Sequence, residues 1–170
     1  MVRIFKFRLF VFSLIFLIFF TFVSVNAIAY TSCNSSVSSG SHTLNNDIIT
    51  NVSCFIFSGN NVYFDCQGYS IVDNGSAAYG FDTNSRSNVT IKNCNIGGFS
   101  NQIHADSMYS NFLNLNLTSG SSIYFVSTTD SIIDNVRIIN SFRALDLRWA
   151  KNVNISNVYI ENATNSGIYM

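Results

Sequence analysis

The sequence predicts an all-β fold, a parallel β-helix solenoid of about five coils with about 22 residues in each coil. The first observation behind this prediction is a repeat of apolar and asparagine columns that runs from Phe55 to the C-terminus. The second is the composition, because serine, threonine and asparagine are abundant while lysine and glutamate are scarce. Such a composition disfavours long helices and favours short strands joined by turns.

Four tracts of the sequence align without gaps, and each places asparagine in the same column. These asparagines are Asn93, Asn114, Asn135 and Asn157, with spacings of 21, 21 and 22 residues. Two positions earlier the column is apolar in every tract, and it holds Ile91, Phe112, Ile133 and Ile155. A fixed period of this length indicates a solenoid, in which each repeat buries its apolar face against its neighbours.

Three short segments in each repeat show the two-residue alternation that is typical of strands. In the first segment of one repeat, Phe81 and Thr83 are predicted to point inward while Asp82 points outward. In the next repeat, Ile103 is predicted to point inward and His104 outward. Because no helical pattern of ten residues separates the segments, each coil is expected to add one rung to each of three parallel sheets.

The asparagine column lies between the second and third of these segments. Asparagine tolerates the left-handed backbone conformation that a tight corner requires. When such corners stack in register, the side-chain amides can hydrogen-bond from one coil to the next. We therefore predict an asparagine ladder along the axis of the solenoid.

The two ends of the repeat region are expected to differ. Residues 30–54 are predicted to form an N-terminal cap, and residues 55–170 hold the repeats. The sequence stops at Met170, inside the first strand of a new coil that begins near Ile168. Because a solenoid needs a capped terminal repeat, we expect an open C-terminal end that further sequence of a longer protein, or a partner, would cover.

Residues 1–29 have the pattern of a secretory signal peptide. Three basic residues precede an apolar run over 9–25, and Ala27-Ile28-Ala29 fits a small-x-small cleavage site. The alternative is an uncleaved anchor and membrane attachment through this segment, because a helix of 17 residues is about 26 Å long. Cleavage would remove three of the nine basic residues and none of the nine acidic ones, which leaves a formal charge of −3. No basic patch for nucleic acid remains.

All four cysteines follow the signal segment, which favours two disulfides in an exported chain. Of the three possible pairings we favour Cys33–Cys54, which would tie down the N-terminal cap, and Cys66–Cys94, which would link consecutive coils. The alternative for Cys66 and Cys94 is a pair of buried free thiols. No C-x-x-C pair is present, so no zinc site and no other metal site is expected.

A family resemblance lies in the segment 54–72, CFIFSGNNVYFDCQGYSIV. Its order of Cys54, Asn61-Val62, Asp65-Cys66, Gly68 and Ile71 resembles the opening coil of secreted β-helix repeat proteins from archaea and bacteria. These are right-handed parallel β-helices of the pectin-lyase-like superfamily, and the preceding tract 42–48 resembles their capping strand. The resemblance implies a right-handed winding. It leaves the function open, because the superfamily includes lyases, hydrolases, adhesins and non-catalytic surface proteins.

The outward column of the first strands is where this resemblance implies binding of polysaccharide. It reads Asp82, His104, Tyr124, Asp146 and Tyr169. Tyr124 and Tyr169 are candidates for stacking on sugar rings, and Asp82, His104 and Asp146 are candidate catalytic residues. The alternative is an ordinary row of solvated side chains on the outside of a sheet.

Spacing argues against a glycosidase built from this column. Asp82 and Asp146 are three coils apart, so at about 4.8 Å per rung they would lie about 14 Å from each other. Paired catalytic carboxylates need about 5–9.5 Å. Neither the paired-aspartate and Gly-His-Gly motifs of polygalacturonases nor the arginine-bearing motif of pectate lyases is present.

Basic residues gather close to Asp146 in the sequence. They are Arg143, Arg148 and Lys151, with Trp149 among them. Two interpretations fit this group: a site for an acidic sugar, or a surface loop with a local ion pair.

The sequence as a whole favours an exported, non-catalytic β-helix module that binds carbohydrate or serves in adhesion or surface structure. The alternative is a polysaccharide lyase or glycoside hydrolase. The expected partner is an extracellular polysaccharide or cell-surface glycan, without nucleic acid and without a cofactor. One or two occupied glycosylation sites are expected among the sequons at Asn34, Asn51, Asn74, Asn88, Asn116, Asn154 and Asn162.

Overall fold

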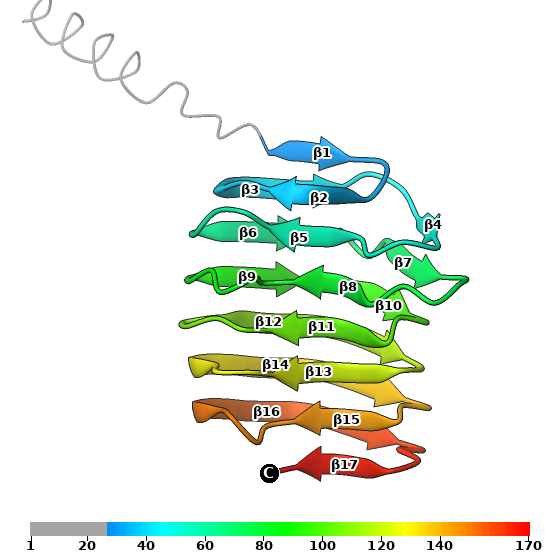
Figure 1. Cartoon of the computed structure of the whole chain (residues 1–170), viewed down its shortest axis with the longest axis vertical. Coiled ribbons are helices and arrows are strands. Elements are labelled where there is room, and N and C mark those ends of the chain that lie inside the picture. The colour runs from blue at the N-terminus through cyan, green and yellow to red at the C-terminus, as the bar shows by residue number, and fades with distance from the viewer. Residues whose placement is uncertain (1–26) are drawn as a thin grey trace, which may run out of the picture.

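The fold is a parallel β-solenoid, as the sequence predicts (Figure 1). The computed structural model describes residues 27–170, and over this range the chain forms strands and turns but no helix. Accordingly, none of the described residues belongs to a helix that could cross a membrane. The predicted signal peptide lies outside the described residues, except for Ala27, Ile28 and Ala29.

One sheet, called sheet B, collects the first strand of each coil. In the described range its seven parallel strands are β2 (Asn34–Val37), β5 (Phe55–Phe57), β8 (Tyr79–Asp82), β11 (Asn101–Ala105), β13 (Ser121–Phe125), β15 (Arg143–Asp146) and β17 (Ser166–Tyr169). The pairing of β2 with β5 contains a register shift, whereas the strands from β5 onward pair in register. Phe81 therefore lies beside Phe55 on one side and Ile103 on the other. The seven rungs correspond to about six turns of the solenoid.

The remaining strands of the coils form sheet A, which bends at the asparagine column. Its ten strands within residues 27–170 are β1 (Ile28–Tyr30), β3 (Gly40–Leu44), β4 (Ile48–Thr50), β6 (Val62–Asp65), β7 (Ser70–Asp73), β9 (Val89–Lys92), β10 (Asn95–Gly97), β12 (Asn111–Thr118), β14 (Thr129–Ile139) and β16 (Lys151–Glu161). The two arms are separate strands in the early coils, whereas β12, β14 and β16 run through the bend. The expectation of three separate sheets is therefore wrong for the later coils.

The arms merge where the corner takes only one residue and the paired strands continue on both sides of it, as in β12 and β14. Asn114 and Asn135 have φ angles of 54° and 52°, in the left-handed region. At the same corner, the backbone N–H of Asn93 still donates to the carbonyl oxygen of Leu113, with an N···O distance of 3.1 Å. A single left-handed residue thus turns the strand while backbone pairing continues across it.

The corner side chains bond along the axis. Nδ2 of Asn135 lies 2.9 Å from Oδ1 of Asn114, and Nδ2 of Asn114 lies 3.0 Å from Oδ1 of Asn93. At the N-terminal end, Asn93 donates to the carboxylate of Asp65 at 2.9 Å. At the other end, Asn157 donates to Asp134 instead of Asn135. The ladder therefore joins Asn93, Asn114 and Asn135, and its N-terminal end is the carboxylate of Asp65.

The core fills the space between the two sheets. The column that holds Phe112 pairs in register with Ile91 and Ile133, and all three side chains are fully buried. Phenylalanine dominates the N-terminal half, where the rings of Phe64 and Phe81 meet edge to face with centroids 5.0 Å apart. Each buried phenylalanine stabilises the fold by about 2 kcal/mol through the hydrophobic effect.

Residues 34–50 add a further coil at the N-terminal end. Its strands β2, β3 and β4 pair in parallel with β5, β6 and β7. Strand β1 then lies on β3, where the ring of Tyr30 stacks on His42 and Phe64. The region predicted as a cap thus contains one coil of the same type as those that follow, with β1 above it.

The coil of β16 and β17 is less enclosed than the others. No residue in the range 151–170 is fully buried. Val153, Ile155, Val158 and Ile160 pack against the core and remain partly exposed.

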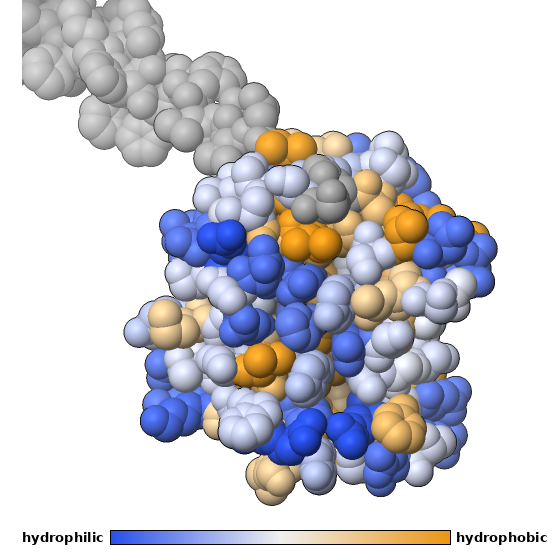
Figure 2. Space-filling view, in the orientation of Figure 1, coloured by the Kyte–Doolittle hydropathy of each residue, from blue (hydrophilic) through white to orange (hydrophobic). Residues whose placement is uncertain are grey.

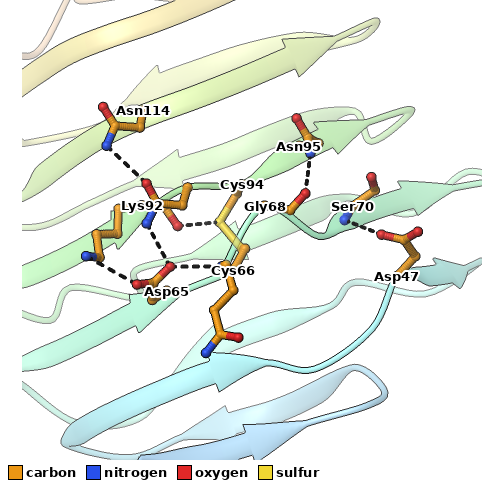
Figure 3. Close-up of a disulfide and its surroundings, with 11 residues drawn as sticks. Asp47, Asp65, Cys66, Gly68, Ser70, Lys92, Cys94, Asn95 and Asn114 are labelled. Atoms are coloured by element: carbon orange, nitrogen blue, oxygen red, sulfur yellow. Dashed lines mark hydrogen bonds and ion pairs between the residues drawn. A yellow bond between two sulfur atoms is a disulfide. The ribbon is translucent and has the colours of Figure 1, made fainter.

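Two disulfides link coils, and both pair the cysteines as predicted. They are Cys33–Cys54 and Cys66–Cys94, with Cα–Cα distances of 4.4 and 4.9 Å. Figure 3 shows the second disulfide beside the ion pair of Lys92 and Asp65, whose nearest N and O atoms are 3.2 Å apart. Since all four cysteines are paired, the alternative of free thiols is excluded.

Candidate functional site

The outer face of sheet B brings the five predicted site residues into one row. The Cα partners are Asp82 with His104, His104 with Tyr124, Tyr124 with Asp146 and Asp146 with Tyr169. The sheet B strands β8, β11, β13, β15 and β17 contribute one residue each, so the row runs parallel to the axis of the solenoid (Figure 1). In the space-filling view of this face, strongly hydrophilic side chains gather over β15 and β17 (Figure 2).

At the N-terminal end of the row, Asp82 and His104 form a hydrogen-bonded pair. Oδ1 of Asp82 lies 2.9 Å from Nδ1 of His104, and the two side chains are 14% and 20% exposed. The same oxygen also accepts the backbone N–H of Asn84 at 2.9 Å. The imidazole ring stacks on Tyr79, with centroids 4.9 Å apart, and tilts against Tyr124 at 5.7 Å. The histidine is thereby held in one orientation.

Tyr79 belongs to this site, although sequence reasoning missed it. Strict alternation in β8 gives Tyr79 the same direction as Phe81 and Thr83, which point into the core. In the structure Gly80 and Phe81 are both buried, so the alternation is broken at the start of the strand. The same pair of consecutive buried residues recurs in β11 and β13, so the break repeats from coil to coil.

At the other end of the row, Asp146 is clamped by two guanidinium groups. Arg148 donates from Nε and Nη2 at 2.9 and 2.8 Å, and Arg143 donates from Nη1 at 3.2 Å. The Asp146 side chain is only 3% exposed, whereas those of Arg143 and Arg148 are about one third exposed. Two cations thus enclose one anion, and one positive charge remains without a partner within this cluster.

The clamp fixes the charge of the aspartate. Burial raises the pKa of Asp146, but the hydrogen bonds from Arg148 and the positive charges of Arg148 and Arg143 outweigh it, so the pKa lies below its usual value. Arg148 in turn has a raised pKa because of its hydrogen bond to Asp146. Asp146 is therefore an ionised acceptor for the arginines and is unsuited to proton transfer at neutral pH.

Tyr169 completes the cluster from the last strand. The Cζ atoms of Arg143 and Arg148 lie 4.9 and 4.7 Å from the centroid of its ring. Both distances fit cation–π contacts. The ring of Tyr169 is therefore already in contact with the two arginines. Lys151, by contrast, begins β16 and belongs to sheet A.

A small pocket opens between the clamp and the middle of the row. Its volume is about 150 Å³, and it is lined by Asn101, Ser121, Tyr124, Arg143, Asp146 and Arg148. Pockets for whole drug-sized ligands are typically about 300–1,000 Å³, so this pocket fits one polar substituent of a larger ligand. Asn101 and Ser121 are paired across β11 and β13 and were not among the predicted site residues.

The arrangement does not bring two free carboxylates together. Three rungs separate Asp82 from Asp146, which corresponds to about 14 Å, and catalytic pairs need about 5–9.5 Å. Among residues 27–170, no group of three or more His, Cys, Asp and Glu side chains could hold a metal ion.

Comparison with known proteins adds no assignment. No protein-family model, no curated protein and no solved structure matches this chain.

Proposed function

We propose that this chain is an exported, non-catalytic β-helix module that binds an acidic polysaccharide along the outer face of sheet B. The observation that carries the proposal is the pocket beside Asp146, where two arginines face a single carboxylate. A uronic acid carboxylate placed there would accept hydrogen bonds from guanidinium N–H groups that Asp146 does not use. The row of Tyr124 and His104 would then contact the neighbouring sugars.

Location and family are part of the proposal. The two disulfides are typical of an extracellular, oxidising environment. Together with the predicted signal peptide, they support secretion or display on the cell surface, in the manner of right-handed β-helix proteins of the pectin-lyase-like superfamily. Glycosylation is proposed first at Asn51 and Asn74, because both are exposed in turns next to strands β4 and β7.

The test is affinity electrophoresis and calorimetry of the oxidised protein with polygalacturonate, alginate and neutral dextran. We expect retardation by the acidic polymers only. Arg148→Gln should weaken binding about tenfold, equivalent to about 1.4 kcal/mol. Arg137→Gln is the matched control, because Arg137 lies on sheet A and pairs with Glu161 at 3.6 Å. Equal losses in both variants would indicate general charge attraction and would contradict the proposal.

A second candidate function rests on the pair of Asp82 and His104. A histidine oriented by a carboxylate is suited to proton abstraction or donation, as in a polysaccharide lyase or glycoside hydrolase. Incubation with uronic-acid polymers, followed by assays for unsaturated products and reducing ends, distinguishes the two functions. Activity that is lost in Asp82→Ala or His104→Ala would refute the non-catalytic proposal.

A further inference from the structure

A second surface, the amide groove, follows the outer side of the bend in sheet A. One wall is the column Asn93, Asn114, Asn135 and Asn157, and the other includes Asn116, Arg137 and Tyr159. The groove has a volume of about 410 Å³ and passes across the rungs of β10, β12, β14 and β16. None of the five residues predicted from the sequence for sheet B lines it.

The amides leave hydrogen-bonding capacity unused. A side-chain amide has two N–H donors and an oxygen with two lone pairs. Asn114 donates one N–H to Asn93 and accepts one from Asn135, which leaves one donor and one acceptor position. Asn114, Asn135 and Asn157 are all exposed. The wall therefore offers both donors and acceptors at the spacing of the rungs, about 4.8 Å.

The charges of the groove are balanced. Nη2 of Arg137 lies 3.6 Å from a carboxylate oxygen of Glu161, and both side chains are about half exposed. The guanidinium carbon of Arg137 also lies 5.8 Å from the centroid of the Tyr159 ring. Tyr159 is 55% exposed, so most of an aromatic surface remains open at this end of the groove. The groove thus suits a neutral ligand, unlike the pocket beside Asp146.

We infer that the amide groove binds a neutral, extended polysaccharide that lies along the axis of the solenoid. Sugar hydroxyls both donate and accept, which matches the free positions of the amides, and Tyr159 provides a platform for the face of one sugar ring. An extended peptide fits less well. The backbone at Leu115 and Val136, in the floor, is already paired between β12 and β14, so no strand edge is free to bind a main chain.

This site does not depend on the function proposed for sheet B. If both sites bind, the module joins an acidic polymer on one sheet to a neutral polymer on the other. In that case the protein would cross-link two components of an extracellular matrix, and this consequence rests on the proposed function as well.

The experiment uses the oxidised protein and cellohexaose as the probe, with polygalacturonate as the comparison. We expect cellohexaose to bind and to shift the side-chain amide resonances of Asn114 and Asn135 in NMR spectra. Tyr159→Ala should weaken this binding about tenfold and leave polygalacturonate binding unchanged. Tyr63→Ala is the matched control, since Tyr63 is an exposed tyrosine on sheet A with Lys92 Nζ 4.9 Å from its ring centroid.

The outcomes separate the two sites. Loss of polygalacturonate binding in Arg148→Gln with intact cellohexaose binding supports the amide groove as an independent site. Absence of cellohexaose binding, equal weakening by Tyr63→Ala, or shifts confined to residues of sheet B would each overturn the inference. The resonance shifts of the wild-type protein keep the inference testable even where Tyr159→Ala folds poorly.

Discussion

Asn157 donates its side-chain amide to Asp134 and not to the ladder residue Asn135, with Nδ2 2.9 Å from Oδ1 of the carboxylate. The hydroxyl of Ser156 donates to the same oxygen at 2.7 Å. The hydrogen bonds from Ser156 and Asn157 lower the pKa of Asp134. At this corner the asparagine thus donates to a neighbouring carboxylate in place of an amide, while Asn157 keeps its left-handed φ of 51°. Backbone conformation and side-chain stacking at the corner are separable properties.

Substitutions at Asn114 should separate these two properties in practice. Asn114→Ala loses both ladder hydrogen bonds. It also places alanine, which tolerates the left-handed conformation less well than asparagine, at φ 54°. We therefore expect a loss of about 2 kcal/mol in the free energy of unfolding. Asn114→Gly keeps the backbone conformation and should lose about 1 kcal/mol. Urea denaturation measures both values. Equal losses would show that the side-chain ladder alone determines the effect.

The disulfides should contribute strongly to stability. Cys33–Cys54 and Cys66–Cys94 close loops with sequence separations of 21 and 28 residues. Replacing either pair by alanine should lower the free energy of unfolding by about 3 kcal/mol, chiefly because the unfolded chain gains freedom. Thermal and urea unfolding with and without reductant measures the change. Reductant should have no further effect on a variant that lacks all four cysteines, and a persistent effect would point to another cause.

Gly120 and Gly68 form a matched pair for glycine substitution. Both have positive φ, 65° and 87°. A Cβ at Gly120 would collide with the carbonyl oxygen of Phe99, whereas a Cβ at Gly68 would meet nothing within 4 Å. We expect Gly68→Ala to cost about 1 kcal/mol and Gly120→Ala about 3 kcal/mol, because only the second also requires the backbone to shift. Similar melting temperatures for the two variants would contradict this account of the turn between β12 and β13.

His42 should make stability depend on pH near neutrality. Its side chain is fully buried, Nε2 lies 2.8 Å from the carbonyl oxygen of Ser38, and Nδ1 has no partner. Burial lowers the pKa of His42, and the hydrogen bond to Ser38 offsets only part of this. The unfolded chain therefore binds the proton more readily than the folded chain does. The stability contributed by the neutral ring is fully present above the unfolded pKa of about 6.5 and is lost as the pH falls through the lower folded pKa.

The measurement is the melting temperature at about pH 7.5 and about pH 5.5, on either side of the ordinary histidine pKa. The wild-type protein should melt at a lower temperature in the more acidic buffer. His42→Gln should have a lower melting temperature in both buffers, but its melting temperature should differ less between them. A flat wild-type profile would contradict the buried neutral ring.

The sequence sufficed for the architecture because columns such as Ile91, Phe112 and Ile133 repeat at a constant interval, and in the structure these residues are neighbours in register. The pair Cys66–Cys94 could be predicted for the same reason, since residues one coil apart lie side by side, whereas Cys33–Cys54 was predicted as a link that ties down the N-terminal cap. The coil of residues 34–50 carries too few matches to these columns to be detected. The merging of the strand arms at Asn114 and Asn135 depends on how sharply one residue bends the chain, and alternation does not encode this.

The candidate site was predicted only as far as periodicity reaches. The order of Asp82, His104 and Tyr124 along sheet B follows from the repeat. The clamp on Asp146 depends on the conformations of two side chains, Arg143 from the strand and Arg148 from the turn after it. The spacing of these residues in the sequence was compatible both with a ligand site and with an ion pair. The amide groove could not be predicted, because the repeat places the asparagines at corners and in a ladder but does not show the groove beside them.

The placement of the disulfides gives the described part of the molecule a mechanical polarity. Cys33–Cys54 and Cys66–Cys94 staple the coils around Phe55 and Phe64, while no cross-link follows Cys94 within residues 27–170. Because each coil touches only its neighbours, local opening spreads rung by rung and not through the whole molecule at once. Backbone amides should thus exchange with solvent slowly around Phe64 and progressively faster toward β16. A pulling force applied at the β17 end would unfold the coils one at a time until it reached the coils that are linked by disulfides.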